Sequence, residues 1–226
     1  MPTPPRATRP QATPTSRPDF DPAFRDRLRE LFRWRRDVRR FRTDPVAPAL
    51  IDALLADAAL APSVGYSQPW RFVSVEAVAR RQAVVENYRR CNQQALGAYE
   101  GERAKLYAGL KLAGLVEAPV HLAAFCDEGT ATGHGLGRQT MPETLRYSVV
   151  MAVHTLWLTA RAQGLGVGWV SILDPDAVRQ TLDVQADWSL VAYLCIGYPE
   201  TEQAEPELAR AGWEQRQDPA AAILRR

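Results

Sequence analysis

The longest helix that the sequence predicts is apolar on nearly every face. It spans residues 143–163. The stripe along one side of it consists of Val149, Val150, Val153, Leu156, Trp157 and Ala160. Met151, Ala152 and Leu158 lie off this stripe, so other sides of the helix carry apolar side chains as well. Because such a helix must be buried on most of its faces, we expect it in the middle of the core or at a subunit interface.

Helices and strands follow one another in an irregular order along the chain. Helices are expected at about 23–35, between Pro48 and Pro62, twice within 77–114, at 143–163 and at 175–182, and strands at 71–75, 120–127, 166–173 and 189–199. The last strand is an unbroken apolar run, which suits a central strand covered on both faces. No internal repeat is visible, and this order predicts one α+β or mixed α/β domain.

The first 22 residues differ in composition from the rest of the chain. They contain seven of the 17 prolines, together with many Thr, Ser and Arg residues. Such a segment buries too little apolar surface to offset the entropy of ordering, so residues 1–22 are predicted to form a disordered tail. Residues 23–226 remain for one folded domain. Within that domain, the charged stretch at about 85–114 is predicted to be an exposed excursion.

Charge and residue spacing disfavour several classes of function. The 28 Lys and Arg residues nearly balance the 26 Asp and Glu residues, which argues against a broad basic surface for nucleic acid. No run approaches the ~18 apolar residues of a membrane span. Cys91, Cys126 and Cys195 lie far apart, and the three histidines lack metal-ligand spacing. We therefore expect a cytoplasmic protein with no metal, membrane or nucleic-acid partner.

One cluster of arginines surrounds a single acidic residue. In the segment RRDVRRF, which runs from Arg35 to Phe41, three arginines (35, 36 and 39) bracket Asp37. Guanidinium groups suit bidentate recognition of phosphate, and three so close together repel one another unless an anion or solvent spreads their charge. The alternative is a solvated surface turn in which Asp37 forms local ion pairs.

A polar loop between a predicted helix and a predicted strand is the second candidate. Its sequence is APSVGYSQPW, residues 61–70. Gly65 permits close approach of the backbone to a ligand, and the Gln68 amide can form paired hydrogen bonds. By itself the loop is equally compatible with a capped turn. The chain lacks a P-loop, the glycine spacing of a Rossmann fold and a nucleophile elbow.

Three motifs in one order resemble the nitroreductase superfamily. RRDVRRF, PSVGYSQPW and GLGVGWVS match its arginine element, its P-S-x-x-x-Q-P-W loop and its later glycine-rich strand over about residues 25–216. The resemblance implies a homodimer that binds FMN. It also implies a three-layer α/β/α fold, in which helices flank a central mixed, mainly antiparallel sheet.

One departure narrows the resemblance. Asp37 stands where ordinary nitroreductases carry Ser. With this residue, the chain resembles the 5,6-dimethylbenzimidazole synthase family. The other segments that carry the resemblance are GERAKLY (101–107), GRQTMPETLRYS (137–148) and EPELARAGWEQR (205–216). That family uses O2 to fragment reduced FMN (FMNH2) into erythrose 4-phosphate and the lower-ligand base of cobalamin, vitamin B12. The resemblance therefore implies that FMNH2 is a substrate rather than a recycled cofactor, and that a separate flavin reductase supplies it.

The resemblance also assigns roles to individual residues. The flavin contacts that it implies are Arg35, Arg36, Asp37, Val38, Arg39, Ser63, Gly65, Arg103, Leu112, Ser171 and Arg216. The arginines of 35–39 and Arg216 would bind the phosphate or ribityl end, while Arg103 and Leu112 belong to a lid over the ring. Asp37 would shuttle protons and Ser171 would bind near the reactive edge of the flavin. Burial of Asp37 would raise its pKa and the arginines would lower it, so the sequence leaves the net direction open.

Two other functions fit the same residues. One is an NAD(P)H-dependent nitroreductase or flavin reductase that contains FMN as a cofactor, for which a Ser-like residue at position 37 would be the expected sign. The other is a flavin-sequestering protein without turnover.

Overall fold

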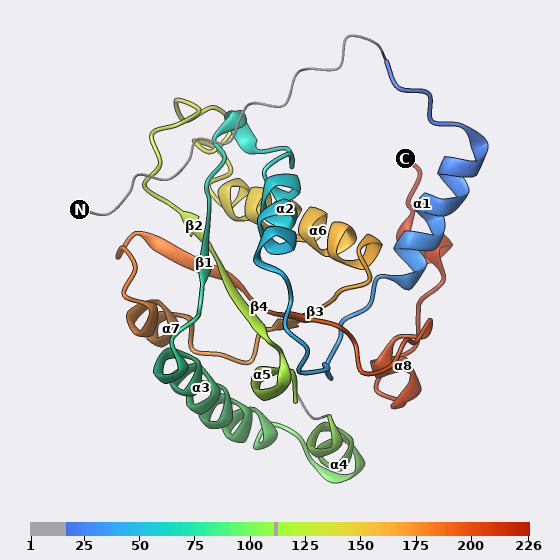
Figure 1. The fold of residues 1–226 in the computed structure, drawn as a ribbon, viewed down its shortest axis with the longest axis vertical. Helices are drawn as coiled ribbons and strands as arrows, with labels where there is room; N and C mark the ends of the chain where they lie inside the picture. The colour runs from blue at the N-terminus through green and yellow to red at the C-terminus, as the bar shows by residue number, and fades with distance from the viewer. Residues whose placement is uncertain (1–16, 111–112) are drawn as a thin grey trace.

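A four-stranded antiparallel sheet in the order β1-β2-β4-β3 organises the molecule (Figure 1). The computed structural model describes residues 17–110 and 113–226. The strands are β1 (Trp70–Ser74), β2 (Val120–Asp127), β3 (Gly166–Val170) and β4 (Trp188–Gly197). The strand predicted to be central, β4, lies between β2 and β3, and β3 forms one edge of the sheet.

Eight α-helices in the described residues surround this sheet. They are α1 (Pro22–Trp34), α2 (Pro48–Ala58), α3 (Val78–Leu96), α4 (Gly101–Gly109), α5 (Gly114–Glu117), α6 (Thr144–Ala162), α7 (Pro175–Leu182) and α8 (Glu207–Arg210). Two 3₁₀ turns, Val64–Tyr66 and Pro219–Ala222, complete the elements. Two of the helices start on the same signal, an aspartate cap followed by proline: Asp21 accepts the Phe24 amide and Asp174 the Ala177 amide.

The alternation of side chains along β2 shows that both faces of the sheet are covered. Leu122 and Ala124 pack into the core cluster formed with α2 and α6, whereas Ala123 and Phe125 pack into a second cluster with α3, α5 and α7. Figure 1 shows α2 and α6 on one side of the sheet and α3 and α7 on the other. The molecule is therefore the three-layer α/β/α fold that the resemblance implied.

The long helix α6 is buried on one side only. Val149, Val153 and Leu156 are fully buried against the sheet. On its other side Tyr147, Val150 and Met151 are 53%, 39% and 38% exposed. The expectation of burial on most faces is thus met only where α6 packs against the sheet and α2, and an apolar stripe remains on the surface of the single chain.

The observed element boundaries refine those expected from the sequence. β2 and α7 occupy the predicted ranges, and the other elements shift by a few residues. The strand predicted at 166–173 ends at Val170. The two helices predicted within 77–114 are α3 and α4, and the short helix α5, from Gly114 to Glu117, was not predicted. Residues 17–21 precede α1 without regular structure. The remainder of the predicted tail, 1–16, lies outside the described residues.

Candidate functional site

The arginine-rich segment lies along the free edge of β3. Asp37 forms a parallel bridge with Val167, and the Val38 amide donates to the Val167 carbonyl at 3.0 Å. Two glycines of the GLGVGWVS motif make this approach possible. A Cβ on Gly168 would overlap the Val38 carbonyl oxygen, and one on Gly166 would lie 2.6 Å from the Val38 side chain. The glycines of this motif therefore leave room for the arginine-rich segment to lie against β3. The bridge between Asp37 and Val167 is the one parallel contact of the sheet among the described residues.

Asp37 is held between groups with opposite effects on its charge. Its Oδ1 accepts the Trp169 amide at 2.9 Å, and its Oδ2 lies 3.4 Å from Arg39 Nε. Burial raises the pKa of Asp37, and the negative charge of Glu207 adds to that effect. The Trp169 hydrogen bond and the Arg39 guanidinium oppose the shift without reversing it. The pKa is therefore above its ordinary value, which favours a group that can bind and release a proton.

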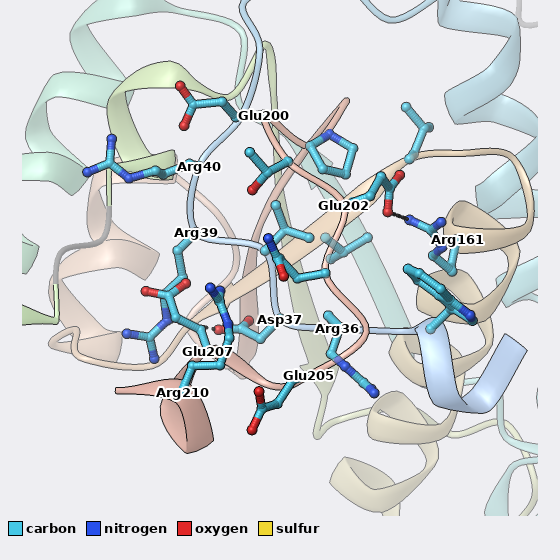
Figure 2. A pocket seen from close by; sticks show the side chains of 18 of the residues that line it. Arg36, Asp37, Arg39, Arg40, Arg161, Glu200, Glu202, Glu205, Glu207 and Arg210 are labelled. Carbon is cyan, nitrogen blue, oxygen red and sulfur yellow. Dashed lines mark hydrogen bonds and ion pairs between the residues drawn. The ribbon is translucent and has the colours of Figure 1, made fainter. Parts of the chain in front are cut away.

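A cavity of about 530 Å³ opens beside Asp37. One wall is the segment 36–40 and the opposite wall is the C-terminal stretch 199–211, while α6 contributes Trp157 and Arg161. Figure 2 shows Arg36, Asp37 and Arg39 on the first wall, with Glu205, Glu207 and Arg210 on the second. The volume lies within the range of small-molecule and cofactor sites.

Three guanidinium groups crowd together at this site. The pKa of Arg36 is lowered by burial and by the positive charges of Arg35 and Arg216. Among the described residues, none of these three arginines has a carboxylate within 4.0 Å. Cations that repel one another without counter-charges form a site for an anion such as a phosphate group. The donor set thus fits the phosphate of FMN.

Trp157 of α6 holds the segment with Arg35 and Arg36 in place. Its indole Nε1 donates to the Arg36 carbonyl at 3.1 Å, and the Arg35 guanidinium lies 5.1 Å from the centre of its ring. Arg36 in turn donates from Nε to the Ala204 carbonyl at 2.7 Å. From the sequence alone Trp157 belongs only to an apolar stripe, because no local signal marks its contacts with residues more than 100 positions away.

Ser171 lies close to Asp37 in the fold. It follows β3 directly, two residues beyond the Trp169 amide that binds Asp37, which corresponds to roughly 7 Å along an extended chain. Its side chain is exposed. The structure thus places the two predicted catalytic residues on the same edge of the sheet.

The loop with Ser63 and Gly65 lies at the opposite end of the sheet. It leads into β1 at Trp70, whose neighbours across the sheet are Cys126 and Ser189, whereas Asp37 lies level with Ile196. Seven residues of β4 separate these levels, roughly 23 Å. The loop therefore enters the sheet at a level far from that of Asp37.

The same loop is rigid in its own right. Gly65 has φ 56°, and a Cβ there would lie 2.9 Å from the carbonyl oxygen of Leu136, in the loop between β2 and α6. The Ser63 hydroxyl accepts the Gln68 amide at 3.1 Å, and Ser148 accepts the Val64 amide at 3.0 Å. The loop is thus preformed, as a binding loop on a scaffold should be.

The two predicted lid residues have different outcomes. Arg103, on α4, donates from Nη1 to the Trp213 carbonyl at 2.8 Å, so its visible partner is the C-terminal segment. Leu112 lies outside the described residues.

The described residues contain no group of three or more His, Cys, Asp or Glu side chains placed to hold a metal ion. No helix among them is both long and apolar enough to cross a membrane.

Comparison with known proteins agrees with this geometry. The Nitroreductase family model matches residues 32–198. A protein of Rhodospirillum rubrum named 5,6-dimethylbenzimidazole synthase is 61% identical over 199 residues, 88% of this chain and 94% of that protein. A protein of Rhodobacter capsulatus with the same name is 51% identical over 197 residues, 87% of this chain and 95% of its own length.

Solved structures show the same fold. The crystal structure of oxidized iodotyrosine deiodinase, bound to FMN and 3-iodo-L-tyrosine, has a TM-score of 0.67 at 25% identity and covers 78% of this chain and 91% of its own. A nitroreductase-like family protein from Bacillus cereus has a TM-score of 0.61 at 20% identity, covering 95% and 97%. The chain therefore belongs to the nitroreductase family, and its curated relatives are named 5,6-dimethylbenzimidazole synthases.

Proposed function

We propose that this chain is a 5,6-dimethylbenzimidazole synthase, which uses O2 to fragment FMNH2 into 5,6-dimethylbenzimidazole and erythrose 4-phosphate. The observation that carries the proposal is the carboxyl group of Asp37, held on the β3 edge beside three arginines that lack counter-charges. The identity of 61% to a relative with this name supports it. A family member that used FMN only as a cofactor would not need an acid at this position.

The arginines hold the substrate by its phosphate. Arg35, Arg36 and Arg216 supply the positive charge, and Arg39 and the Val38 backbone lie where the ribityl chain would extend from it. Trp157 keeps the Arg36 carbonyl, and so the whole segment, in place. Because these groups are fixed before binding, little ordering entropy is lost on binding.

Asp37 is the residue that moves protons. Its raised pKa lets it hold a proton at a pH where an ordinary aspartate is ionised, and Arg39 stabilises the charged form once the proton has left. The carboxyl keeps 37% of its side-chain surface accessible through the cavity, so it can reach a substrate. Ser171 would supply a hydrogen bond to the reacting end of the flavin.

A second copy of the chain completes the site. The loop with Ser63 and Gly65 enters β1 at Trp70, whose level on the sheet is roughly 23 Å from that of Asp37, and in the proposed arrangement a partner chain presents this loop to the flavin. The exposed apolar stripe of α6, with Tyr147, Val150 and Met151, is a surface suited to such a two-fold contact.

Aerobic incubation with chemically reduced FMN tests the function. Chromatography should show 5,6-dimethylbenzimidazole formed at the expense of flavin. With NADH and oxidised FMN alone no product should form, and adding an unrelated flavin reductase should start the reaction. Complete recovery of the flavin, together with steady NADH oxidation in the presence of a nitroaromatic acceptor, would instead establish the nitroreductase activity.

A further inference from the structure

An aromatic cluster joins α4 to the C-terminal segment. Tyr99 and Tyr107 stack at 4.8 Å, and both rings contact Trp213, at 5.5 and 6.2 Å between ring centres. We call these three residues the aromatic bracket. The Tyr107 hydroxyl donates to Asn92 Oδ1 at 2.8 Å, which ties the bracket to α3 and thus to the body of the domain.

Arg103 closes the bracket from the exposed side. Its guanidinium carbon lies 4.9 Å from the centre of the Trp213 ring, and its Nη1 donates to the Trp213 carbonyl at 2.8 Å. The side chain thus makes a cation–π contact and a hydrogen bond to one residue. Both contacts point to the C-terminal segment, 110 positions along the chain.

Along the chain, Trp213 of the aromatic bracket lies between two residues whose charges affect the candidate site. Upstream of Trp213, Glu207 lines the cavity and raises the pKa of Asp37. Downstream, Arg216 contributes positive charge at Arg36. Trp213 itself is anchored to this stretch by its amide, which donates to the Leu208 carbonyl at 2.9 Å. Displacing Trp213 would therefore displace Glu207 and Arg216 together.

We propose that Arg103 and Trp213 are positioning residues, which set Glu207 and Arg216 against the site and fix α4 to the same segment. Arg103 acts through Trp213 rather than by direct contact with flavin. This inference rests on the proposed function only where it predicts a change in the yield of 5,6-dimethylbenzimidazole. Its effect on FMN binding follows from the arginine cluster alone.

A double-mutant cycle on FMN binding tests the inference. Trp213→Ala and Arg103→Met should each weaken FMN binding on the order of tenfold, because each removes contacts that hold the bracket closed. The double variant should bind FMN no more weakly than either single variant, because both substitutions break one connection. If Arg103 contacted flavin independently, the two losses would multiply to roughly a hundredfold, and the inference would be wrong.

Conservative rescue separates positioning from loss of structure. Trp213→Phe keeps a ring between Tyr99 and Tyr107 and should restore most of the binding that Trp213→Ala loses. Phe20→Ala is the matched control, because Phe20 forms a different exposed aromatic pair with Phe24, at 4.9 Å. It should leave FMN binding unchanged. Equal weakening by Phe20→Ala, or no rescue by Trp213→Phe, would contradict a specific role for Trp213.

The fate of FMNH2 supplies a readout that binding alone does not give. At saturating FMNH2, Trp213→Ala should divert oxidation from 5,6-dimethylbenzimidazole to the simple reaction of FMNH2 with O2, which gives FMN and H2O2. The ratio of H2O2 to product should rise several-fold above that of the unsubstituted chain. An unchanged ratio would overturn the positioning role. If the unsubstituted chain forms no product at all, the proposed function fails, and the binding cycle still decides the inference.

Discussion

At the scale of single residues, Asp37 shows why a family motif needed a structure to explain it. The RRDVRRF segment places arginines on both sides of the carboxyl group, and from sequence their charge and burial act in opposite directions. In the fold Arg39 is 3.4 Å from Oδ2, whereas the cavity wall and Glu207 surround the rest of the group, so burial dominates and the pKa rises. An acid with a raised pKa thus lies next to a cluster of arginines.

Replacing the acid should separate binding from chemistry. Asp37→Asn keeps an oxygen that can accept the Trp169 amide and leaves Arg35, Arg36 and Arg216 in place. FMN affinity should change by less than about threefold, while formation of 5,6-dimethylbenzimidazole should fall at least on the order of a hundredfold, the usual contribution of a proton-transfer group. Flavin fluorescence and product chromatography check the two parts. Undiminished product from the variant would remove Asp37 from the mechanism.

The same substitution should change stability in a pH-dependent way. A raised pKa means that the folded chain binds the Asp37 proton more tightly than the unfolded chain, whose pKa is near 3.8. As pH rises above 3.8, Asp37 therefore lowers the free energy of unfolding, and this loss is complete above the folded pKa. Urea titrations should show that Asp37→Asn gains stability relative to the unsubstituted chain at pH 7, with a smaller gain at pH 4.

Asp44 offers a control of opposite sign. Its pKa is lowered by the hydrogen bond from Arg42, so its charge favours the folded state above the unfolded pKa. Asp44→Asn should therefore lose a little stability at pH 7 relative to pH 4. A shift in the same direction for both variants would show that the effect does not come from the local pKa of Asp37.

At the scale of elements, close backbone approach connects two motifs that the sequence presents as separate. Gly166 and Gly168 lie on β3, and the backbone of Val38 occupies the space that their side chains would fill. The two motifs are 130 positions apart. The family resemblance gave their order along the chain, but it did not show that one packs against the other. The physical link is the parallel bridge between Asp37 and Val167.

A methyl group at position 168 should break this link. Gly168→Ala places a Cβ against the Val38 carbonyl, which belongs to a backbone that is itself hydrogen-bonded to β3 and cannot move freely. We expect a loss of about 1–3 kcal/mol in the free energy of unfolding, typical of overpacking, together with weaker FMN binding. Gly109→Ala is the control, because nothing lies within 4 Å of its Cβ position. Equal stability of the two variants in urea titrations would contradict the close packing of Val38 on β3.

The elements also show where sequence reasoning succeeds and where it stops. The run 120–127 is continuous and apolar, and Asp174 with Pro175 is a strong helix start, so β2 and α7 were predicted with their observed bounds. The strand at 166–173 was predicted too long because its end is set by a distant residue. The Asn87 side chain of α3 accepts the Asp174 amide and donates to the Asp174 carbonyl, which draws the chain away from the sheet.

In the candidate site, too, some residues could be predicted from the sequence and others could not. The residues near Asp37 carry motif signals, so the sequence was enough to propose them as site residues. Glu207, Tyr107 and Trp213 lie within segments that the family resemblance marks, but no local pattern encodes their contacts with distant parts of the chain, or those of Trp157.

At the scale of the whole molecule, the sheet separates two halves of one predicted site. The 35–41 segment lies at the β3 edge near Ile196, and the Ser63 loop leads into β1 at Trp70, which lies level with Ser189, roughly 23 Å away along β4. The exposed stripe of α6 adds an apolar surface with no partner in the single chain. An apolar stripe of this kind, beside a divided ligand site, supports the proposal that the functional unit contains two chains.

Mixed dimers can test this division directly. In a shared site, Asp37 of one chain works with Ser63 of the other. Asp37→Asn disables one part, and Ser63→Trp, which fills the space beside the loop with a large ring, disables the other. Each variant expressed alone should be dimeric and should form no product.

Co-expression of the two variants in equal amounts should restore activity. Half of the dimers that form are mixed, and one of the two sites in each mixed dimer then combines an intact Asp37 with an intact Ser63. Product formation should therefore recover to about a quarter of that of the unsubstituted chain. A site contained within one chain would carry a defect in every copy, so the mixture would stay inactive, and Ser63 would then have no part in binding the flavin from across the two-fold axis.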